Sequence, residues 1–437
     1  MGLFTRRVRG LLSTGAAAVA ALGFACSTGS GTVGAPSWDC GPEGNPSSVK
    51  ATLKGGTLTI GGRGNMANYA YNGNGKVVTS PWYGNSLSIT KVVIENGVTS
   101  IGQWAFYDHQ NLTSVTIGNA VTTIGKDAFD NCAKLTSVTI PANLTEIEVD
   151  ALEDVFDHCA ALKAINVDPN NAKFSSVDGV VFNKDQTTLI LYPEGKAGAY
   201  AIPSGVTSVH NLAFQYCAGL TSVTIPNGVT TIGRGAFNGC TGLTAVTIPN
   251  GVTTIGRGAF NGSGLTSVTI PSGVTSVGSY AFANCAALKS ITVADGVTSL
   301  SDTAFAVCTG LTTVALPNSL TSIGNLTFAA CSSLTSITLP NGVTSIGSEA
   351  FLSCVSLTSV TFGEGIKSIG KRAFNSCSKL TDVTFPESIT AVTWPGWREQ
   401  SYWGQGDWTP HDVFAGNSGM SAETQAAIKK LGYRGKF

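Results

Sequence analysis

The sequence predicts a solenoid of short parallel β-strands stacked one above another, and three observations lead to this fold class. A unit of about 23 residues recurs from Ile94 onward. Within each unit apolar residues alternate with Ser and Thr, as in LTSITL at 334–339, so one face of each strand enters a core. The chain also holds 53 Gly and only 12% charged residues, which favours strands and tight turns over long helices.

A phenylalanine marks the same position in successive units. Most steps between these markers equal the step from Phe328 to Phe351, whereas longer steps precede Phe156, Phe214 and Phe414, and a slightly shorter one precedes Phe282. The register survives, as expected when extra residues loop out of a stack. The markers are Phe106, Phe129, Phe156, Phe214, Phe237, Phe260, Phe282, Phe305, Phe328, Phe351, Phe374 and Phe414.

Each unit predicts two extended pieces and a bend. The first strand ends at Pro or Gly, an Asn-Gly turn follows, and Val-Thr-Ser-Ile-Gly forms a second short strand. We expect the following Ala-Phe-x-x-Cys arc to be a short helical turn that buries Ala, Phe and Cys. The leucine column from Leu112 to Leu380 predicts eleven coils, stacked at about 4.8 Å into a body roughly 50 Å long.

This unit resembles the BspA-like class of bacterial leucine-rich repeats over about residues 94–392. GTLTIGG at 56–62 is similar to the β-rich segment that precedes such repeats, and DGVVFNKD at 178–185 to their inserted unit. We interpret that insertion as a β-hairpin with 183–186 at its turn. The resemblance implies a leucine-rich-repeat solenoid with a surface adhesion or protein-binding role, and it implies no single ligand.

The predicted organisation has five parts. They are a signal peptide (1–25), a flexible tether (26–50), a β-rich N-terminal cap (51–93), the repeats (94–393, with the hairpin insertion at about 168–203), and a Trp-rich loop with a C-terminal cap (394–437). In the first cap, 52–60 reads as one strand. In the second, Ser421 to Leu431 reads as a small helix with Ser421 as N-cap and Gly432 as its stop.

The N-terminus predicts export. Arg6, Arg7 and Arg9 precede an apolar stretch from Leu11 to Phe24 that is too short to span a membrane comfortably. Cys26 then has two interpretations. Cleavage near Ala25 is one, and lipidation of Cys26 is the other, although the lipobox-like segment has Gly23 where an aliphatic residue is usual. We expect an exported protein at the cell surface or outer membrane, with Cys26 as the candidate lipidation site.

Nothing in the sequence indicates catalysis, a cofactor or a metal site. The formal net charge is zero and only 4 His are present, so nucleic acid is not an expected partner. Asp108-His109 and Asp157-His158 read as equivalent, structural positions. Nine cysteines lie three residues after a marker and read as a buried thiol column, with disulfides and a metal site as the less favoured alternatives; they are Cys132, Cys159, Cys217, Cys240, Cys285, Cys308, Cys331, Cys354 and Cys377.

Two groups of residues are ligand-binding candidates. The polar strand positions read either as a solvent-tolerant face or as a hydroxyl-rich sheet that docks a protein or glycan. They are Ser114, Thr116, Ser137, Thr139, Ser222, Thr224, Ser267, Thr269, Ser290, Thr292, Ser336, Thr338, Ser359 and Thr361. The second group either covers the last coil or presents aromatic rings to a ligand, and consists of Trp394, Trp397, Tyr402, Trp403 and Trp408.

The predicted function is therefore that of an exported cell-surface adhesion or binding protein whose partner is an extracellular protein or glycan. Contact with a membrane is expected only through the lipid anchor. The alternative is a structural spacer without a dedicated ligand, and an enzyme is the least favoured class.

Overall fold

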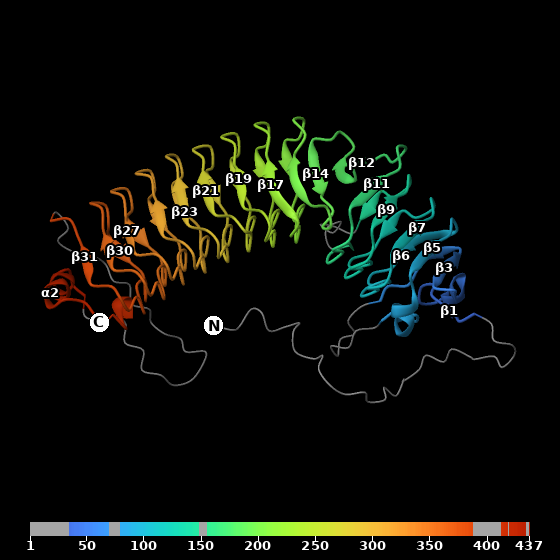
Figure 1. The fold of residues 1–437 in the computed structure, drawn as a ribbon, viewed down its shortest axis with the longest axis horizontal. Coiled ribbons are helices and arrows are strands. Elements are labelled where there is room, and N and C mark those ends of the chain that lie inside the picture. The colour runs from blue at the N-terminus through green and yellow to red at the C-terminus, as the bar shows by residue number, and fades with distance from the viewer. Residues whose placement is uncertain (1–34, 70–78, 148–154, 388–411, 418, 434–436) are drawn as a thin grey trace, which may run out of the picture.

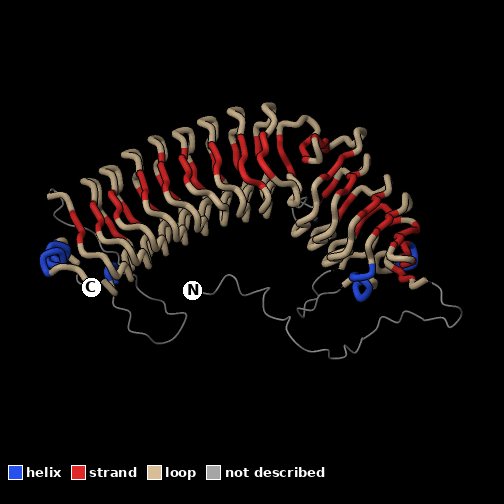
Figure 2. The backbone as a smooth tube through the Cα atoms, in the orientation of Figure 1, coloured by secondary structure: helices blue, strands red, loops and turns tan. Residues whose placement is uncertain are grey.

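The computed structural model describes residues 35–69, 79–147, 155–387, 412–417, 419–433 and 437. Short strands stack side by side along a curved solenoid, with β1 at one end and helix α2 at the other (Figure 1). Most coils contribute a strand near their middle and a shorter strand beside it, and loops lie on both sides of the strands (Figure 2). The predicted parallel-strand solenoid is confirmed.

The first strand of each coil builds what we call the first-strand row. Its paired members run in parallel and mostly keep their register, so that Ser267 faces Ser290 and Thr269 faces Thr292, although the register shifts once, at Gly198. The row comprises β5 (Lys91–Ile94), β7 (Ser114–Ile117), β9 (Ser137–Ile140), β11 (Ala164–Val167), β15 (Gly198–Ala201), β17 (Leu220–Thr224), β19 (Ala245–Thr247), β21 (Ser267–Ile270), β23 (Ser290–Val293), β25 (Thr313–Ala315), β27 (Ser336–Thr338), β29 (Ser359–Thr361) and β31 (Asp382–Thr384).

A second row of shorter strands runs beside the first. Most of its members are two residues long and also pair in parallel, as Ser322 does with Ser345. They are β6 (Val98–Ile101), β8 (Thr123–Ile124), β10 (Glu146–Ile147), β16 (Ser208–Val209), β18 (Thr231–Ile232), β20 (Thr254–Ile255), β22 (Ser276–Val277), β24 (Ser299–Leu300), β26 (Ser322–Ile323), β28 (Ser345–Ile346) and β30 (Ser368–Ile369).

Around most marker phenylalanines the arc is not a helical turn, so that prediction is wrong there, whereas Phe414 ends a short 3-10 helix at Asp412–Phe414. Around Phe351, Glu349 and Ser353 have positive φ values of 59° and 60°, which no right-handed helix permits. The backbone N–H groups of Glu349, Phe351 and Ser353 donate to carbonyls in the next coil at 2.8, 2.7 and 2.9 Å. The arc's hydrogen bonds therefore join coils to one another, and the same three forward bonds recur in most coils.

The marker phenylalanines form a column of stacked rings through the core. From Phe214 to Phe414 successive ring centroids lie 4.7–5.5 Å apart. Two other aromatic residues extend the column. Trp82 stacks on Phe106 at 5.8 Å, and Tyr192 stacks on Phe214 at 4.9 Å. Tyr192 thus fills a marker position within the longest step of the pattern, which runs from Phe156 to Phe214.

The N-terminal cap differs from the single strand predicted over 52–60. β2 (Val49–Lys54) and β3 (Thr57–Gly62) form an antiparallel hairpin, and the chain reverses at Gly55 and Gly56, whose φ values are 55° and 77°. β3 then pairs in parallel with β5, the first member of the first-strand row. β1 (Ser37–Asp39), η1 (Pro46–Ser48), β4 (Gly64–Asn65) and η2 (Tyr83–Ser88) complete the cap.

The insertion consists of three antiparallel strands, β12 (Phe174–Val177), β13 (Val180–Asn183) and β14 (Thr188–Leu191). It stands between two hydrophobic cores. Val180 and Phe182 belong to the core of the C-terminal coils, whereas Val181 belongs to the core of the N-terminal coils. We call these two parts the N-terminal and C-terminal stacks. Because both faces of β13 are buried, the insertion is a partition between the stacks.

The C-terminal end carries η3 (Asp412–Phe414) and the predicted small helix, α2 (Ala422–Lys430), which is confirmed. The Oγ of Ser421 accepts the N–H of Thr424 at 3.1 Å, an N-cap. Ile428 is the side chain of α2 that is fully buried, and α2 lies against β31. No helix in the described ranges is long and apolar enough to cross a membrane.

Candidate binding surface

The outward face of the first-strand row carries the predicted hydroxyl positions. In β23, Ile291 points into the core while Thr292 on the same strand is exposed. The threonines of all seven predicted pairs are exposed, and the serines are exposed or half-buried. This exposure follows from the two-residue period of a strand with one buried face.

These hydroxyl groups form no hydrogen bonds within the described part of the chain, in contrast to two neighbouring threonine columns. The hydroxyl of Thr358 donates to Thr335 O at 2.9 Å, and that of Thr344 donates to Thr321 O at 3.1 Å, each reaching the equivalent threonine of the preceding coil. Threonines in those columns brace adjacent coils. The outward serines and threonines of the first-strand row keep their donors and acceptors free for solvent or a ligand.

Charge is confined to the ends of this face. Lys91 stands at its N-terminal end and Asp382 at its C-terminal end. Between them, the outward positions of the described strands carry Ser, Thr, Ala and one Asn, Asn166. We call this uncharged surface the hydroxyl face, defined by the outward positions of β7 to β29. Its short side chains make it flat, so a partner must bind mainly through hydrogen bonds.

The repeat cysteines form a buried column that holds backbone carbonyls. The Sγ of Cys331 donates to Phe305 O at 3.3 Å, and that of Cys377 donates to Phe351 O at 3.2 Å, each in the preceding coil. All nine are buried free thiols. Other residues take the same place where cysteine is missing. Asn417 donates to Phe374 O at 2.9 Å, and Ser263 lies 3.3 Å from Cys285 Sγ.

Burial makes these thiols poor nucleophiles. It raises the pKa of Cys240 and of Cys331 to about 12, because a thiolate would have to stand in an apolar interior. A hydrogen bond with Cys377, together with burial, raises the pKa of Cys354. No group of three or more His, Cys, Asp or Glu suited to a metal ion occurs among the residues with described positions.

Each repeat unit combines a stacked aromatic ring, a buried thiol and a short parallel strand. This unit is the feature by which the family can be recognised. The family model for the BspA-type leucine-rich-repeat region, of six copies, matches residues 77–200, 192–312 and 298–394. The chain belongs to the BspA-type leucine-rich-repeat family. As a member it is a repeat scaffold of the kind found in bacterial surface proteins and used in protein interactions.

Solved structures of other leucine-rich-repeat proteins are similar to this BspA-type chain. One from Eubacterium ventriosum is 26% identical, with 88% of this chain and 95% of that chain covered and a TM-score of 0.49. One from Bacteroides ovatus is 24% identical, with coverages of 78% and 94% and a TM-score of 0.45. The pneumococcal vaccine antigen PcpA is 21% identical, with coverages of 69% and 92% and a TM-score of 0.45. No curated protein matches the sequence.

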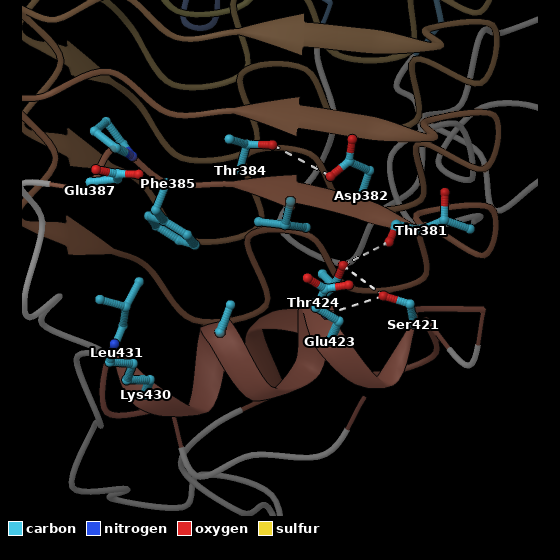
Figure 3. A pocket seen from close by; sticks show the side chains of 13 residues that line it. Thr381, Asp382, Thr384, Phe385, Glu387, Ser421, Glu423, Thr424, Lys430 and Leu431 are labelled. Carbon is cyan, nitrogen blue, oxygen red and sulfur yellow. Dashed lines mark hydrogen bonds between the residues drawn. The ribbon is translucent and has the colours of Figure 1, made fainter.

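An open groove of about 800 Å³ lies where the BspA-type repeats end. It runs between β31 and α2, and Figure 3 shows Asp382, Thr384 and Phe385 on one side and Glu423, Thr424 and Lys430 on the other. The Oγ1 of Thr424 donates to Thr381 O at 3.2 Å. The helix therefore covers part of the edge that the last strand would otherwise expose.

Two sets of predicted site residues lie outside the described residues. They are Cys26, the lipidation candidate, and the aromatic set Trp394, Trp397, Tyr402, Trp403 and Trp408. Both remain predictions.

The two histidines occupy different arc positions, so their predicted equivalence is wrong. His109 is three residues after Phe106 and fully buried, at the place that cysteine takes elsewhere. His158 is two residues after Phe156, has a φ of 56°, and has a side chain that is 54% exposed. The one-residue difference arises because Asp108, rather than His109, takes the left-handed position in its coil.

A polar cluster around His158 was not foreseen from the sequence. It brings Asp130, Asp157 and Glu194 near the imidazole. The signal that could have revealed it is Glu194, which stands two residues after the aromatic Tyr192, as His158 stands two residues after Phe156.

Proposed function

We propose that this BspA-type protein is an exported, non-catalytic surface protein that binds an extracellular protein or glycan through its hydroxyl face. The observation that carries the proposal is the set of aligned, exposed hydroxyl groups without intramolecular partners in the described part of the chain. Removing such groups from water is favourable only if the ligand supplies hydrogen bonds in return. The family's association with surface proteins supports the same conclusion.

The lack of charge on the hydroxyl face indicates how such a ligand would be held. Ion pairs would weaken as salt shortens the range of electrostatic attraction, whereas neutral hydrogen bonds would be affected much less. Binding should therefore persist in about 0.5 M NaCl, where the Debye length is only about 4–5 Å.

The test is a binding screen of the purified protein against matrix proteins, mucins and neutral glycans. The variant Thr269→Arg/Thr292→Arg places two bulky cations side by side on the hydroxyl face, since these residues pair directly. Val307→Arg is the matched control, because Val307 is exposed on an arc away from this face. Loss of ligand in the double variant alone supports the proposal. Binding that both variants retain excludes the hydroxyl face.

A protein that binds nothing in the screen would instead favour the spacer role. Export and anchoring need a separate measurement. Native protein should partition into detergent, and Cys26→Ser should release it into the aqueous phase. Partitioning that ignores this substitution would exclude lipidation of Cys26.

A further inference from the structure

The regular contacts between coils are interrupted between Phe156 and Tyr192. The first-strand row divides there, between β11 and β15; it also divides between β19 and β21 and between β25 and β27, but the marker rings stay stacked at those two places. No ring contact joins Phe156 to Tyr192 in the described structure, although Phe129 stacks on Phe156 at 5.7 Å and Tyr192 on Phe214 at 4.9 Å. The two hydrophobic cores meet at this interruption.

Charged and polar side chains occupy the interruption, and we call them the joint: Asp130, Asp157, His158, Glu194, Gln215 and Tyr216. His158 Nδ1 lies 3.0 Å from Asp130 Oδ1. Gln215 Nε2 donates to Asp157 Oδ2 at 3.2 Å, and the rings of His158 and Tyr216 are 4.9 Å apart. Gln215 and Tyr216 come from the C-terminal stack, so these contacts link the two stacks.

The packing of the joint leaves a small cavity. A cavity of about 10 Å³ is lined by Asp157, Glu194 and Gln215 together with apolar residues of both stacks, which is room for about one water molecule. The Oε1 atom of Gln215 is buried without a partner. An unsatisfied buried acceptor costs about 1–3 kcal/mol, so a proton donor in this cavity would stabilise the joint.

Proton uptake alters the charge balance of the joint. With a neutral imidazole and three ionised carboxylates it carries three negative charges in a partly buried space. Protonating His158 and Glu194 leaves one, strengthens the contact between His158 and Asp130, and turns Glu194 into a donor beside Gln215. Like charges close together in a low dielectric repel, and protonation relieves this repulsion.

The folded protein binds both protons more tightly than the unfolded chain does. Burial raises the pKa of Glu194 to about 7, against an opposing effect of His158. The hydrogen bond with Asp130 raises the pKa of His158. A group whose pKa is raised by folding stabilises the fold below its unfolded value and loses that contribution as pH rises through its folded value. Both groups therefore favour the closed joint in mild acid.

We propose that the joint is a proton-controlled hinge between two rigid stacks, closed when His158 and Glu194 are protonated and loosened when both lose their protons. The titratable groups facing these two residues are Asp130, Asp157, Tyr216 and the buried thiol of Cys217. The hinge does not depend on the hydroxyl face being the binding surface.

Native-state hydrogen exchange of the full chain at pH 6 and pH 8, corrected for intrinsic exchange rates, tests this hinge. Peptides from 155–217 should lose about tenfold in protection between pH 6 and pH 8, the change expected for one carboxyl that titrates near 7 when folded. Peptides from 282–374 in the C-terminal stack should keep their protection. Equal protection of 155–217 at both pH values would overturn the proposal, and this measurement needs no variant.

Two variants assign the effect to the joint. Glu194→Gln, which mimics the protonated carboxyl, should keep high protection at pH 8 and flatten the pH dependence. His158→Gln should lower protection at pH 6. Asp295→Asn, an exposed carboxylate in the C-terminal stack, is the control and should behave like the natural chain. A pH dependence of the same size in Glu194→Gln and in the natural chain would exclude Glu194 as the proton site.

Discussion

The C-terminal stack and the joint are built from the same repeat but held together differently. In the C-terminal stack, each marker ring lies on the ring of the coil before it, and each arc donates to the next coil. At the joint these contacts stop and individual side chains such as His158 take their place, as Asn171 does in the neighbouring insertion. The difference shows that ring stacking and arc hydrogen bonds require a neighbouring coil of the same kind. Where an insertion separates two coils, other side chains must supply specific hydrogen bonds instead.

Removing a marker ring should produce the largest effect and should separate the two regions. Phe351 is fully buried between rings 5.4 and 5.0 Å away. Phe351→Ala should lower the free energy of unfolding by about 3–5 kcal/mol. Phe156 stacks on one marker ring in the described structure, so Phe156→Ala should cost about 1 kcal/mol less. Denaturant unfolding of both variants measures the difference, and equal losses would mean that ring stacking adds nothing to burial.

Asn171 tests how much a specific bonding group contributes at the insertion. Its Nδ2 donates to Pro141 O and Leu144 O, and its Oδ1 accepts the N–H groups of Lys173 and Phe174. Asn171→Ala should cost about 2–4 kcal/mol, because buried backbone groups lose their partners. Asn170 is exposed, so Asn170→Ala should unfold almost like the natural chain. A small loss at 171 would show that water replaces the amide.

The alkylation rates of the buried cysteines should show whether the joint opens more readily than the C-terminal stack. Cys159 and Cys217 flank the joint, whereas Cys331 lies deep in the C-terminal stack. Because thiolates are the reactive form and all three thiols are buried, alkylation at pH 8 requires local opening. Peptide mapping should find faster alkylation at 159 and 217 than at 331, and labelling of all nine after denaturation without reductant. Recovery of one free thiol or none would instead establish disulfides.

The smallest effects should come from the surface hydroxyls. Thr344 braces the preceding coil, so Thr344→Ala should cost about 0.5–1.5 kcal/mol. Thr292 on the hydroxyl face makes no such bond, and Thr292→Ala should stay within about 0.5 kcal/mol. Thermal unfolding compares the two variants. A larger loss at 292 would identify its hydroxyl as a structural group.

The fold could be predicted well because every coil repeats the same pattern of buried and exposed residues. The alternation in SVTI places Val and Ile in the core at every coil, and the markers predicted the ring column. The arc conformation could not be predicted, because Glu349 and Ser353 adopt left-handed backbone conformations that are not typical of Glu and Ser. The polar cluster of the joint could not be predicted for another reason. Asp130, Glu194 and Gln215 are distant in sequence, and they meet only because the insertion shifts the stack.

The forward hydrogen bonds of the arcs give the column of arcs a direction. In most coils the N–H groups of the arc point toward the C-terminal end, whereas backbone N–H groups in the neighbouring threonine columns, such as that of Thr344, point back to the preceding coil. The carbonyls of Gln103, Ala105 and Tyr107 in the first arc each meet a donor, from the Tyr69 backbone, the Trp82 indole and the His109 imidazole.

At the other end the outgoing N–H of Phe414 meets an acceptor, the Tyr433 hydroxyl, at 3.4 Å. The two caps are consequently not interchangeable. A cap that supplies donors fits only the first arc, and a cap that supplies an acceptor fits only the last arc. A chain engineered from such repeats must therefore keep each cap at its own end.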